Sequence, residues 1–206
     1  MAQINLEQLN DLQFDVLKEI GNIGAGNATT ALSKLMNMKI DMGVPTVALV
    51  PITDIAGIIG AEDMPVVGIL LGLQEDVKGT MMFLTTEEAA NVMVNVLLGR
   101  DESAKEPFGE MEYSVISEIG NIIAGAYLSA LSTLTNLTVT ASVPAMTIDM
   151  AGAILSVPAI EYGKIGDKVL FIETQLGEDS ILKGYIVMVP ELESYGKILS
   201  SLGIEC

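Results

Sequence analysis

The sequence predicts an α/β (α+β) sandwich, in which two homologous halves related by an approximate two-fold axis pack an antiparallel β-sheet against long helices. The first observation is an internal repeat: residues 15–38 and 114–137 are identical at 13 of 24 positions. The second is that the same order of helical and strand-like segments follows each copy. The third is that the strand-like segments are too closely spaced for the crossovers of a parallel sheet. We therefore expect residues 1–100 and 101–206 to be two pseudo-symmetric halves of one compact domain.

Each half is expected to start with a long helix and then to form a short strand, a helical or irregular piece, a β-hairpin and a closing helix. Polar turn residues inside each hairpin support that prediction, and Gly99 and Gly203 suit the ends of the closing helices. Thr85 and Glu88 fit a capping box at the first closing helix. The expected helices are 6–37, 86–98, 108–136 and 191–202, and the expected strands are 44–50, 66–73, 78–84, 143–149, 169–176 and 182–189.

The composition excludes several classes of function. Half of the 206 residues are hydrophobic, enough for a substantial core, and the formal net charge of −17 disfavours nucleic acids and anionic membranes as partners. Histidine is absent and Cys206 is the single cysteine, which excludes disulfide frameworks, Cys/His zinc sites and Ser-His-Asp triads. The longest apolar run, residues 65–73, is far shorter than the ~20 residues that span a bilayer, and no secretion signal is visible. We expect a soluble, cytoplasmic protein without membrane insertion.

The motif Glu-Ile-Gly-Asn is the first candidate for a functional site. A helix that only packs in the core needs apolar residues of suitable size, and it rarely needs the same Glu and Asn at the same spacing twice. At ~100° per residue, helix positions i, i+4, i+7 and i+11 share one stripe. The Glu and Asn side chains should therefore lie side by side and point away from the core. The stripe carries Asp15, Glu19, Asn22 and Gly26 in the first copy and Ser114, Glu118, Asn121 and Gly125 in the second.

The opposite face of the first helix should be buried. Glycines inside a helix cost ~1 kcal/mol each relative to alanine, so the three glycines between residues 21 and 26 need a compensating role. Gly24 suits close helix packing, and Gly26 and Gly125 would let a partner's backbone approach the Asn. The expected buried face consists of Phe14, Leu17, Ile20, Gly24, Ala28, Ala31 and Leu35.

Two other interpretations of the motif compete with a functional one. A Glu and an Asn three residues apart are common on solvated helices, and duplication repeats any sequence. Retention is uneven, however, because nearby outward positions differ between the copies, as in Lys18/Ser117 and Asn27/Ala126. A phosphate loop is disfavoured, since no strand precedes the glycines and the Lys-Ser/Thr ending is missing. We therefore favour a functional role for the polar residues.

The duplicated pattern Asp/Ser-x3-Glu-x2-Asn, at residues 15–22 and 114–121, resembles the CheC/CheX/FliY family of chemotaxis phosphatases. Asp15 and Ser114 fill the first motif position, where the family accepts either residue type. Two motifs in one chain look like the CheC branch, because CheX carries one motif and FliY adds a C-terminal flagellar-switch domain. The resemblance covers nearly the whole chain.

The resemblance implies an activity and roles for the motif residues. The family hydrolyses the aspartyl phosphate of the response regulator CheY. Asn22 and Asn121 would orient a water for in-line attack on phosphorus, and Glu19 and Glu118 would engage the receiver's lysine and fix the docking pose. No cofactor or metal of the protein's own is implied, because the receiver domain supplies Mg²⁺ together with the acyl phosphate and the lysine.

By the same resemblance, the expected partners are phosphorylated CheY and the receptor deamidase CheD. We expect a monomer whose two halves offer independent docking sites. The alternative is a non-catalytic regulatory module that binds CheD, or an adaptor in the flagellar switch. Loss of dephosphorylation in variants of the two motif asparagines would distinguish the enzyme from these binding modules.

Overall fold

The computed structural model describes residues 11–40, 45–162, 168–176 and 182–204. It confirms the mixed helical and antiparallel architecture and, within the described residues, each of the expected elements with boundaries shifted by a few residues. Residues 6–10 of the first expected helix and residue 44 of the first expected strand lie outside the described residues. In chain order the elements are α1 (Asp11–Met36), β1 (Thr46–Pro51), the 3-10 helix η2 (Ile52–Asp54), α2 (Ile55–Ile59), β2 (Pro65–Glu75), β3 (Gly79–Thr86), α3 (Glu87–Leu98), α4 (Glu110–Thr135), β4 (Val139–Ala141), β5 (Ala145–Met150), α5 (Ala151–Tyr162), β6 (Lys168–Leu176), β7 (Leu182–Pro190) and α6 (Leu192–Ser201).

The sheet interleaves strands from the two halves. Its order is β1-β6-β7-β3-β2-β4, with β5 also paired to β2, and every pairing is antiparallel. β1 and its counterpart β5 each join the hairpin of the other half, since β1 pairs with β6 and β5 pairs with β2. β3 and β7 pair in the middle, with Phe83 opposite Ile186. Each half therefore completes the sheet of the other around an approximate two-fold axis.

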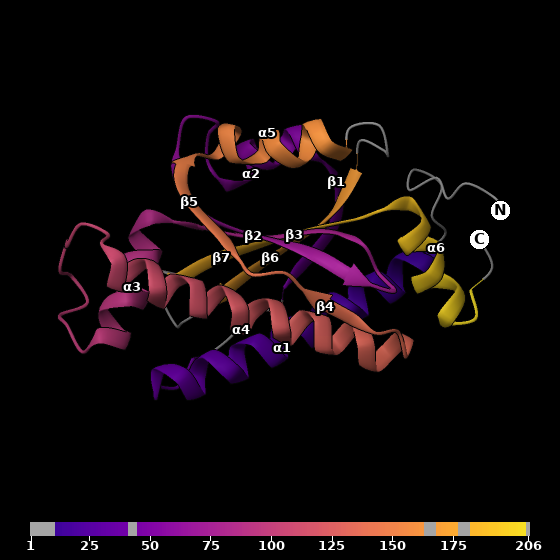
Figure 1. Cartoon of the computed structure of the whole chain (residues 1–206), viewed down its shortest axis with the longest axis horizontal. Coiled ribbons are helices and arrows are strands. Elements are labelled where there is room, and N and C mark those ends of the chain that lie inside the picture. The colour runs from indigo at the N-terminus through magenta and orange to yellow at the C-terminus, as the bar shows by residue number, and fades with distance from the viewer. Residues whose placement is uncertain (1–10, 41–44, 163–167, 177–181, 205–206) are drawn as a thin grey trace.

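Helices cover both faces of the sheet and both of its ends (Figure 1). α1 and α4 lie against one face, α2 and α5 against the other, and α3 and α6 lie at opposite ends. Two apolar cores result. The larger contains Leu17, Ile20, Ile116 and Ile119 of the long helices, and the smaller lies under α2 and α5. Alternation along the central strands sends successive side chains to the two cores.

At the contact between α1 and α4, equivalent positions of the two halves differ in size in opposite directions. Gly24 of α1 corresponds to Ile123 of α4, and Ala28 of α1 corresponds to Tyr127 of α4. A Cβ atom on Gly24 would overlap the ring of Tyr127, so the missing side chain makes room for that ring. In the other half the equivalent residues are Ile123 and Ala28, which line the same small internal void as Tyr127. The expectation that Gly24 serves close helix packing is confirmed. Divergence at the contact is therefore compensated in volume, as a close-packed interior requires.

Several details of the sequence-based prediction are wrong. Leu35 is exposed and Phe14 and Ala31 are only partly buried, because the core stripe of α1 runs instead through Gly21, Ala25 and Leu32. The cap of α3 is Thr86, whose hydroxyl accepts a hydrogen bond from the Ala89 N–H at 3.1 Å. Thr85 lies one residue before the N-cap position, because α3 begins at Glu87, and its side chain is buried.

Strand β4 was not expected from the sequence. It spans three residues and is defined by its pairing with Leu73–Glu75 of β2. A strand this short has no alternation to detect, and its neighbour fixes its conformation. β4 forms one edge of the sheet directly after α4, which becomes important for the second motif.

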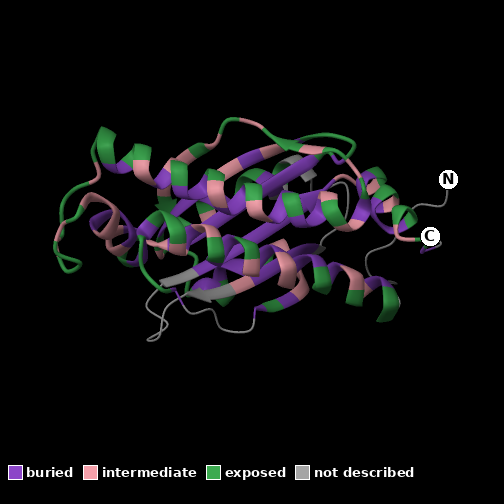
Figure 2. Cartoon of the chain, turned by 90° about the horizontal axis from the view of Figure 1, so that it is seen from below, coloured by how far each residue is buried: buried purple, intermediate pink, exposed green. Residues whose placement is uncertain are grey.

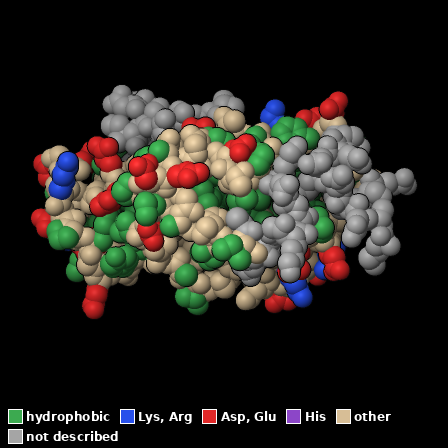
Figure 3. Space-filling view, turned by 90° about the horizontal axis from the view of Figure 1, so that it is seen from above, with side chains coloured by type: hydrophobic (Ala, Val, Ile, Leu, Met, Phe, Trp, Pro, Cys, Tyr) green, Lys and Arg blue, Asp and Glu red, His purple; other side chains and the backbone are tan. Residues whose placement is uncertain are grey.

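The α2/α5 face has a mixed surface. Figure 3 views the protein from the α2/α5 side and shows hydrophobic side chains interspersed with acidic ones.

Helix α4 is long and apolar. Its length and composition alone would let it cross a bilayer, and half of its most apolar stretch is buried inside the protein. Such burial is typical of a core helix.

A duplicated candidate active site on the paired helices

The motif residues lie where the sequence places them, on the outer stripes of α1 and α4. Glu19, Glu118 and Asn121 are exposed, and Asn22 is partly exposed. Seen from below, the two long helices present exposed and partly exposed positions outward and buried positions toward the sheet (Figure 2). The structure thus confirms that the Glu and Asn of each motif point away from the core on a rigid element. Asp15 and Ser114, one turn earlier, are exposed as well.

The glycine inside each motif brings the helix close to the sheet. A Cβ atom on Gly21 would lie 2.8 Å from Cγ2 of Val47, and one on Gly120 would lie 2.6 Å from Cδ1 of Ile69. Val47 lies on β1 and Ile69 on β2, which are not equivalent strands. The counterpart of Ile69 is Ile172 of β6, and a Cβ atom on Gly21 would lie 3.3 Å from Cδ1 of Ile172, so both motif glycines face equivalent hairpin strands. A side chain at the motif glycine would therefore force a shift, either of the sheet side chain beneath it or of the turn that carries the Glu and the Asn. This role was not expected from the sequence, although the retention of the glycine in both copies is a signal of it.

The outer glycines have the opposite surroundings. Cβ atoms on Gly26 and Gly125 would meet no atom within 4 Å. These residues follow the motif asparagines by one helical turn, so they leave the surface beside each Asn low and open. That arrangement is compatible with the predicted approach of a partner's backbone.

Beside the second motif the stripe continues into a groove between α4 and the edge strand β4. The groove has a volume of about 390 Å³. Asn121 and Gly125 are part of its wall, so the second motif opens directly into it. Ser132 lies in the same stripe, because eleven residues correspond to about three turns of helix. The lining is Asn121, Ala124, Gly125, Leu128, Ser129, Ser132, Val139, Thr140 and Ala141.

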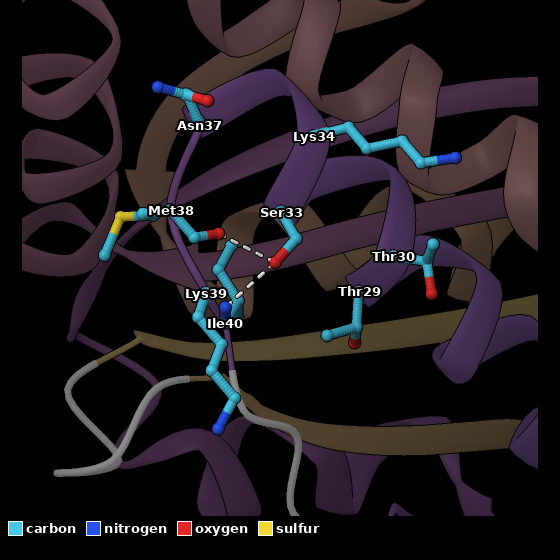
Figure 4. Close-up of a pocket in the computed structure, with 8 residues that line it drawn as sticks. All are labelled: Thr29, Thr30, Ser33, Lys34, Asn37, Met38, Lys39 and Ile40. Carbon is cyan, nitrogen blue, oxygen red and sulfur yellow. Dashed lines mark hydrogen bonds between the residues drawn. The ribbon is translucent and has the colours of Figure 1, made fainter.

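A groove of about 540 Å³ occupies the related place at the C-terminal part of α1. Figure 4 shows Ser33 at its centre, where the hydroxyl donates to the Met38 carbonyl at 2.8 Å and accepts from the Ile40 N–H at 2.9 Å. These bonds close the chain back onto the helix and shape the groove. Its lining is Thr29, Thr30, Ser33, Lys34, Asn37, Met38, Lys39 and Ile40. Neither groove was expected from the sequence, because each depends on the chain that follows the helix.

An ionised carboxylate anchors the start of α4. Glu112 is buried, pairs with Arg100 at 2.7 Å and accepts a hydrogen bond from the Gly109 N–H at 2.9 Å. Hydrogen bonds from its own backbone N–H and from Gly109, with a further contribution from Arg100, hold the pKa of Glu112 below its ordinary value. The predicted charged linker is therefore tied to the helix. Glu112 lies two residues before Ser114, the first motif position, so these contacts fix the start of the helix that carries the second motif.

The arrangement can orient and dock, and it offers no strong nucleophile. A carboxamide is a poor base but can hold a water at a fixed angle, and a carboxylate on the same stripe can bind a cation of a partner. In the part of the chain that the structure describes, these groups lie on the outer surface of the helices, and the groove beside Asn121 is open to solvent. Chemistry at this surface therefore has to be completed by a second molecule that brings its own reactive groups.

Comparisons with known proteins agree with the duplicated motif. A sequence profile of the CheC-like family matches residues 12–49 and 111–148, so each match contains one motif helix and the segment after it. A relative from Bacillus subtilis strain 168, named CheY-P phosphatase CheC, is 36% identical over 200 residues, which cover 95% of this chain and 96% of the relative. This chain belongs to the CheC-like family.

Solved structures share the fold of this CheC-like protein. Thermotoga maritima FliY superimposes with a TM-score of 0.72 at 21% identity and covers 95% of this chain and 98% of its own. A chain from the CheX-CheY-BeF3-Mg²⁺ complex of Borrelia burgdorferi gives a TM-score of 0.52 at 17% identity, covering 82% of this chain and 95% of its own. The fold is therefore found both in chains of the FliY type and in the CheX complex.

Proposed function

We propose that this CheC-like protein hydrolyses the aspartyl phosphate of phosphorylated CheY. The observation that carries the proposal is the pair of identical Glu-Ile-Gly-Asn turns, each held against the sheet by its glycine with the Glu and Asn facing outward. The relative named CheY-P phosphatase CheC, which aligns over nearly the whole of both chains, supports the same activity.

In the proposed reaction the asparagine acts on water. Asn22 or Asn121 would hold a water in line with the bond between phosphorus and the aspartyl oxygen of the receiver. The water oxygen bonds to phosphorus as that bond breaks, the aspartate leaves as a carboxylate, and inorganic phosphate is released. Phosphoryl transfer passes through a loose transition state, so catalysis rests mainly on positioning and charge stabilisation. An amide on a rigid helix meets that requirement.

The glutamate would provide docking. Glu19 or Glu118, one turn before the asparagine, would pair with the lysine that a receiver domain carries beside its phosphorylated aspartate. The Mg²⁺ ion and the acyl phosphate belong to the substrate, so the protein itself would contribute only the oriented amide and the carboxylate. Gly26 and Gly125 keep the neighbouring surface open for the receiver's backbone. We expect both sites to work independently on a cytoplasmic monomer.

The decay of phosphorylated CheY in the presence of Mg²⁺ tests the proposal. Catalytic amounts of the wild type should accelerate the decay, each single Asn→Ala variant should retain part of the acceleration, and the double variant Asn22→Ala/Asn121→Ala should lose it. The expected loss per site is about 10²-fold or more if water orientation is the main contribution. Asn27→Ala is a matched control, because Asn27 is an exposed asparagine of α1 off the stripe and the second copy has alanine there.

The same variants address the alternative. Because both motif asparagines are at least partly exposed, each substitution should change the free energy of unfolding by no more than about 0.5 kcal/mol. Unchanged dephosphorylation in the double variant would contradict the proposed mechanism. No acceleration even by the wild type, with retained binding of the deamidase CheD, would instead establish a non-catalytic binding module or switch adaptor.

A further inference from the structure

The two grooves beside the motifs differ in charge. The groove of the first half includes Lys34 and Lys39, whereas the lining of the second groove contains no charged side chain. The offset of 99 residues makes Thr133 and Thr138 the equivalents of the two lysines. This contrast is notable in a chain that has 10 basic residues against 27 acidic ones. The duplicated sites are thus alike in the motif and unlike in the surface beside it.

The cationic groove lies within reach of a protein docked on the first motif. A rise of 1.5 Å per residue puts Thr30 roughly 12 Å and Lys34 roughly 18 Å along α1 from Asn22. A typical interface covers about 800 Å² on each partner, or roughly 16 Å in every direction from its centre. A receiver centred on Asn22 would therefore cover the near end of this groove at Thr30, and the backbone of Lys34 would lie about 2 Å beyond its edge, within the length of the lysine side chain. Figure 4 shows the side chains of Lys34 and Lys39 pointing in different directions from the groove.

We propose that this groove binds an acidic segment of the phosphoprotein substrate and makes docking at the first site salt-dependent, whereas docking at the second site lacks this contact. The inference rests on the proposed function, because it takes the substrate to be a receiver docked on Asn22. Rim charges act mainly on association and on its salt dependence. On a protein of net charge −17, two lysines beside one motif counter the repulsion that an acidic partner meets elsewhere on the surface.

A structural role for the lysines is the competing explanation. Lys34 lies in the last turn of α1, where a positive charge is favourable to the helix dipole. Lys39 lies beyond the helix and also has an interaction within the chain, so Lys34 is the sharper probe. A role at the helix end predicts a change in stability, whereas a role in docking predicts a change in KM at one site only.

The test exchanges equivalent residues between the halves. In an Asn121→Ala background, where only the first site works, Lys34→Thr should raise KM for phosphorylated CheY about threefold at low salt, leave kcat unchanged and flatten its salt dependence. In an Asn22→Ala background the same substitution should have no effect. Thr133→Lys in that second background should lower KM and introduce salt dependence.

Three results would overturn the inference. They are an unchanged KM and salt dependence for Lys34→Thr at the first site, an equal effect in both backgrounds, or an effect explained by a lower melting temperature. The proposed function fails separately, through unchanged dephosphorylation in the double asparagine variant. Calorimetric titration with BeF3-activated CheY at two salt concentrations measures the contribution of the groove to binding without any catalysis. It therefore distinguishes failure of the groove proposal from failure of the proposed phosphatase function.

Discussion

Helices α1 and α4 carry the same functional stripe but are supported differently. The motif turn of each contacts the sheet through its glycine, whereas the residues at their mutual contact have exchanged size, with Gly24 against Tyr127 and Ala28 beside Ile123. The start of α4 is fixed by a buried carboxylate, and the equivalent position in α1 is the buried but uncharged Gln13. The outward groups that would meet a substrate are constant, and the packing around them has diverged in compensating pairs.

The largest expected effect comes from removing the large member of the exchanged pair. Tyr127 is 1% exposed and its ring fills the space left by Gly24. Tyr127→Ala should lower the free energy of unfolding by about 3–5 kcal/mol, because it removes a buried ring and leaves a cavity. Urea unfolding measures the loss. Tyr113→Ala is a matched control on the same helix, since Tyr113 is 40% exposed and should cost far less; equal losses would show that the exchange carries no special weight.

A smaller effect is expected from the motif glycines. Gly120→Ala would place its Cβ 2.6 Å from Cδ1 and 2.8 Å from Cγ2 of Ile69, so either the Ile69 side chain or the helix turn has to shift. We expect a loss of about 1–3 kcal/mol in unfolding free energy and reduced dephosphorylation at the second site. Gly125→Ala has space for its methyl group and should stabilise the helix by up to about 1 kcal/mol. Activity measured in an Asn22→Ala background isolates the second site, and normal activity of Gly120→Ala there would contradict the positioning role.

The smallest expected effect concerns the carboxylate that anchors the start of α4. The pKa of Glu112 is lowered in the folded protein from an ordinary value of 4.5. The ionised carboxylate therefore contributes stability at pH values above 4.5, and this contribution is lost as the pH falls through the lowered folded value. Glu112→Gln should be less stable than the wild type at pH 7, and the difference should shrink in acid. Thermal unfolding across this range measures it, with Glu110→Gln as an exposed control on the same turn; a difference independent of pH would exclude the ionised form as the cause.

Local patterns were sufficient to predict much of the protein. The repeat, the helical stripe and the turn residues predicted the long helices, both hairpins and the outward direction of Glu19, Asn22, Glu118 and Asn121, and the structure confirms all of these. They succeed because helix periodicity and strand alternation are properties of neighbouring residues along the chain. The catalytic roles of the motif residues remain predictions that the proposed variants test.

Contacts between distant parts of the chain decided the rest. No local pattern indicates that β1 pairs with β6 and β5 with β2, that three residues form the edge strand β4, or that Gly21 and Gly120 rest on the sheet. The two grooves likewise arise where each helix meets the chain that follows it. The sequence alone therefore determined which groups face outward, and tertiary structure decided what surrounds them, because packing partners are chosen by shape and volume across the whole fold.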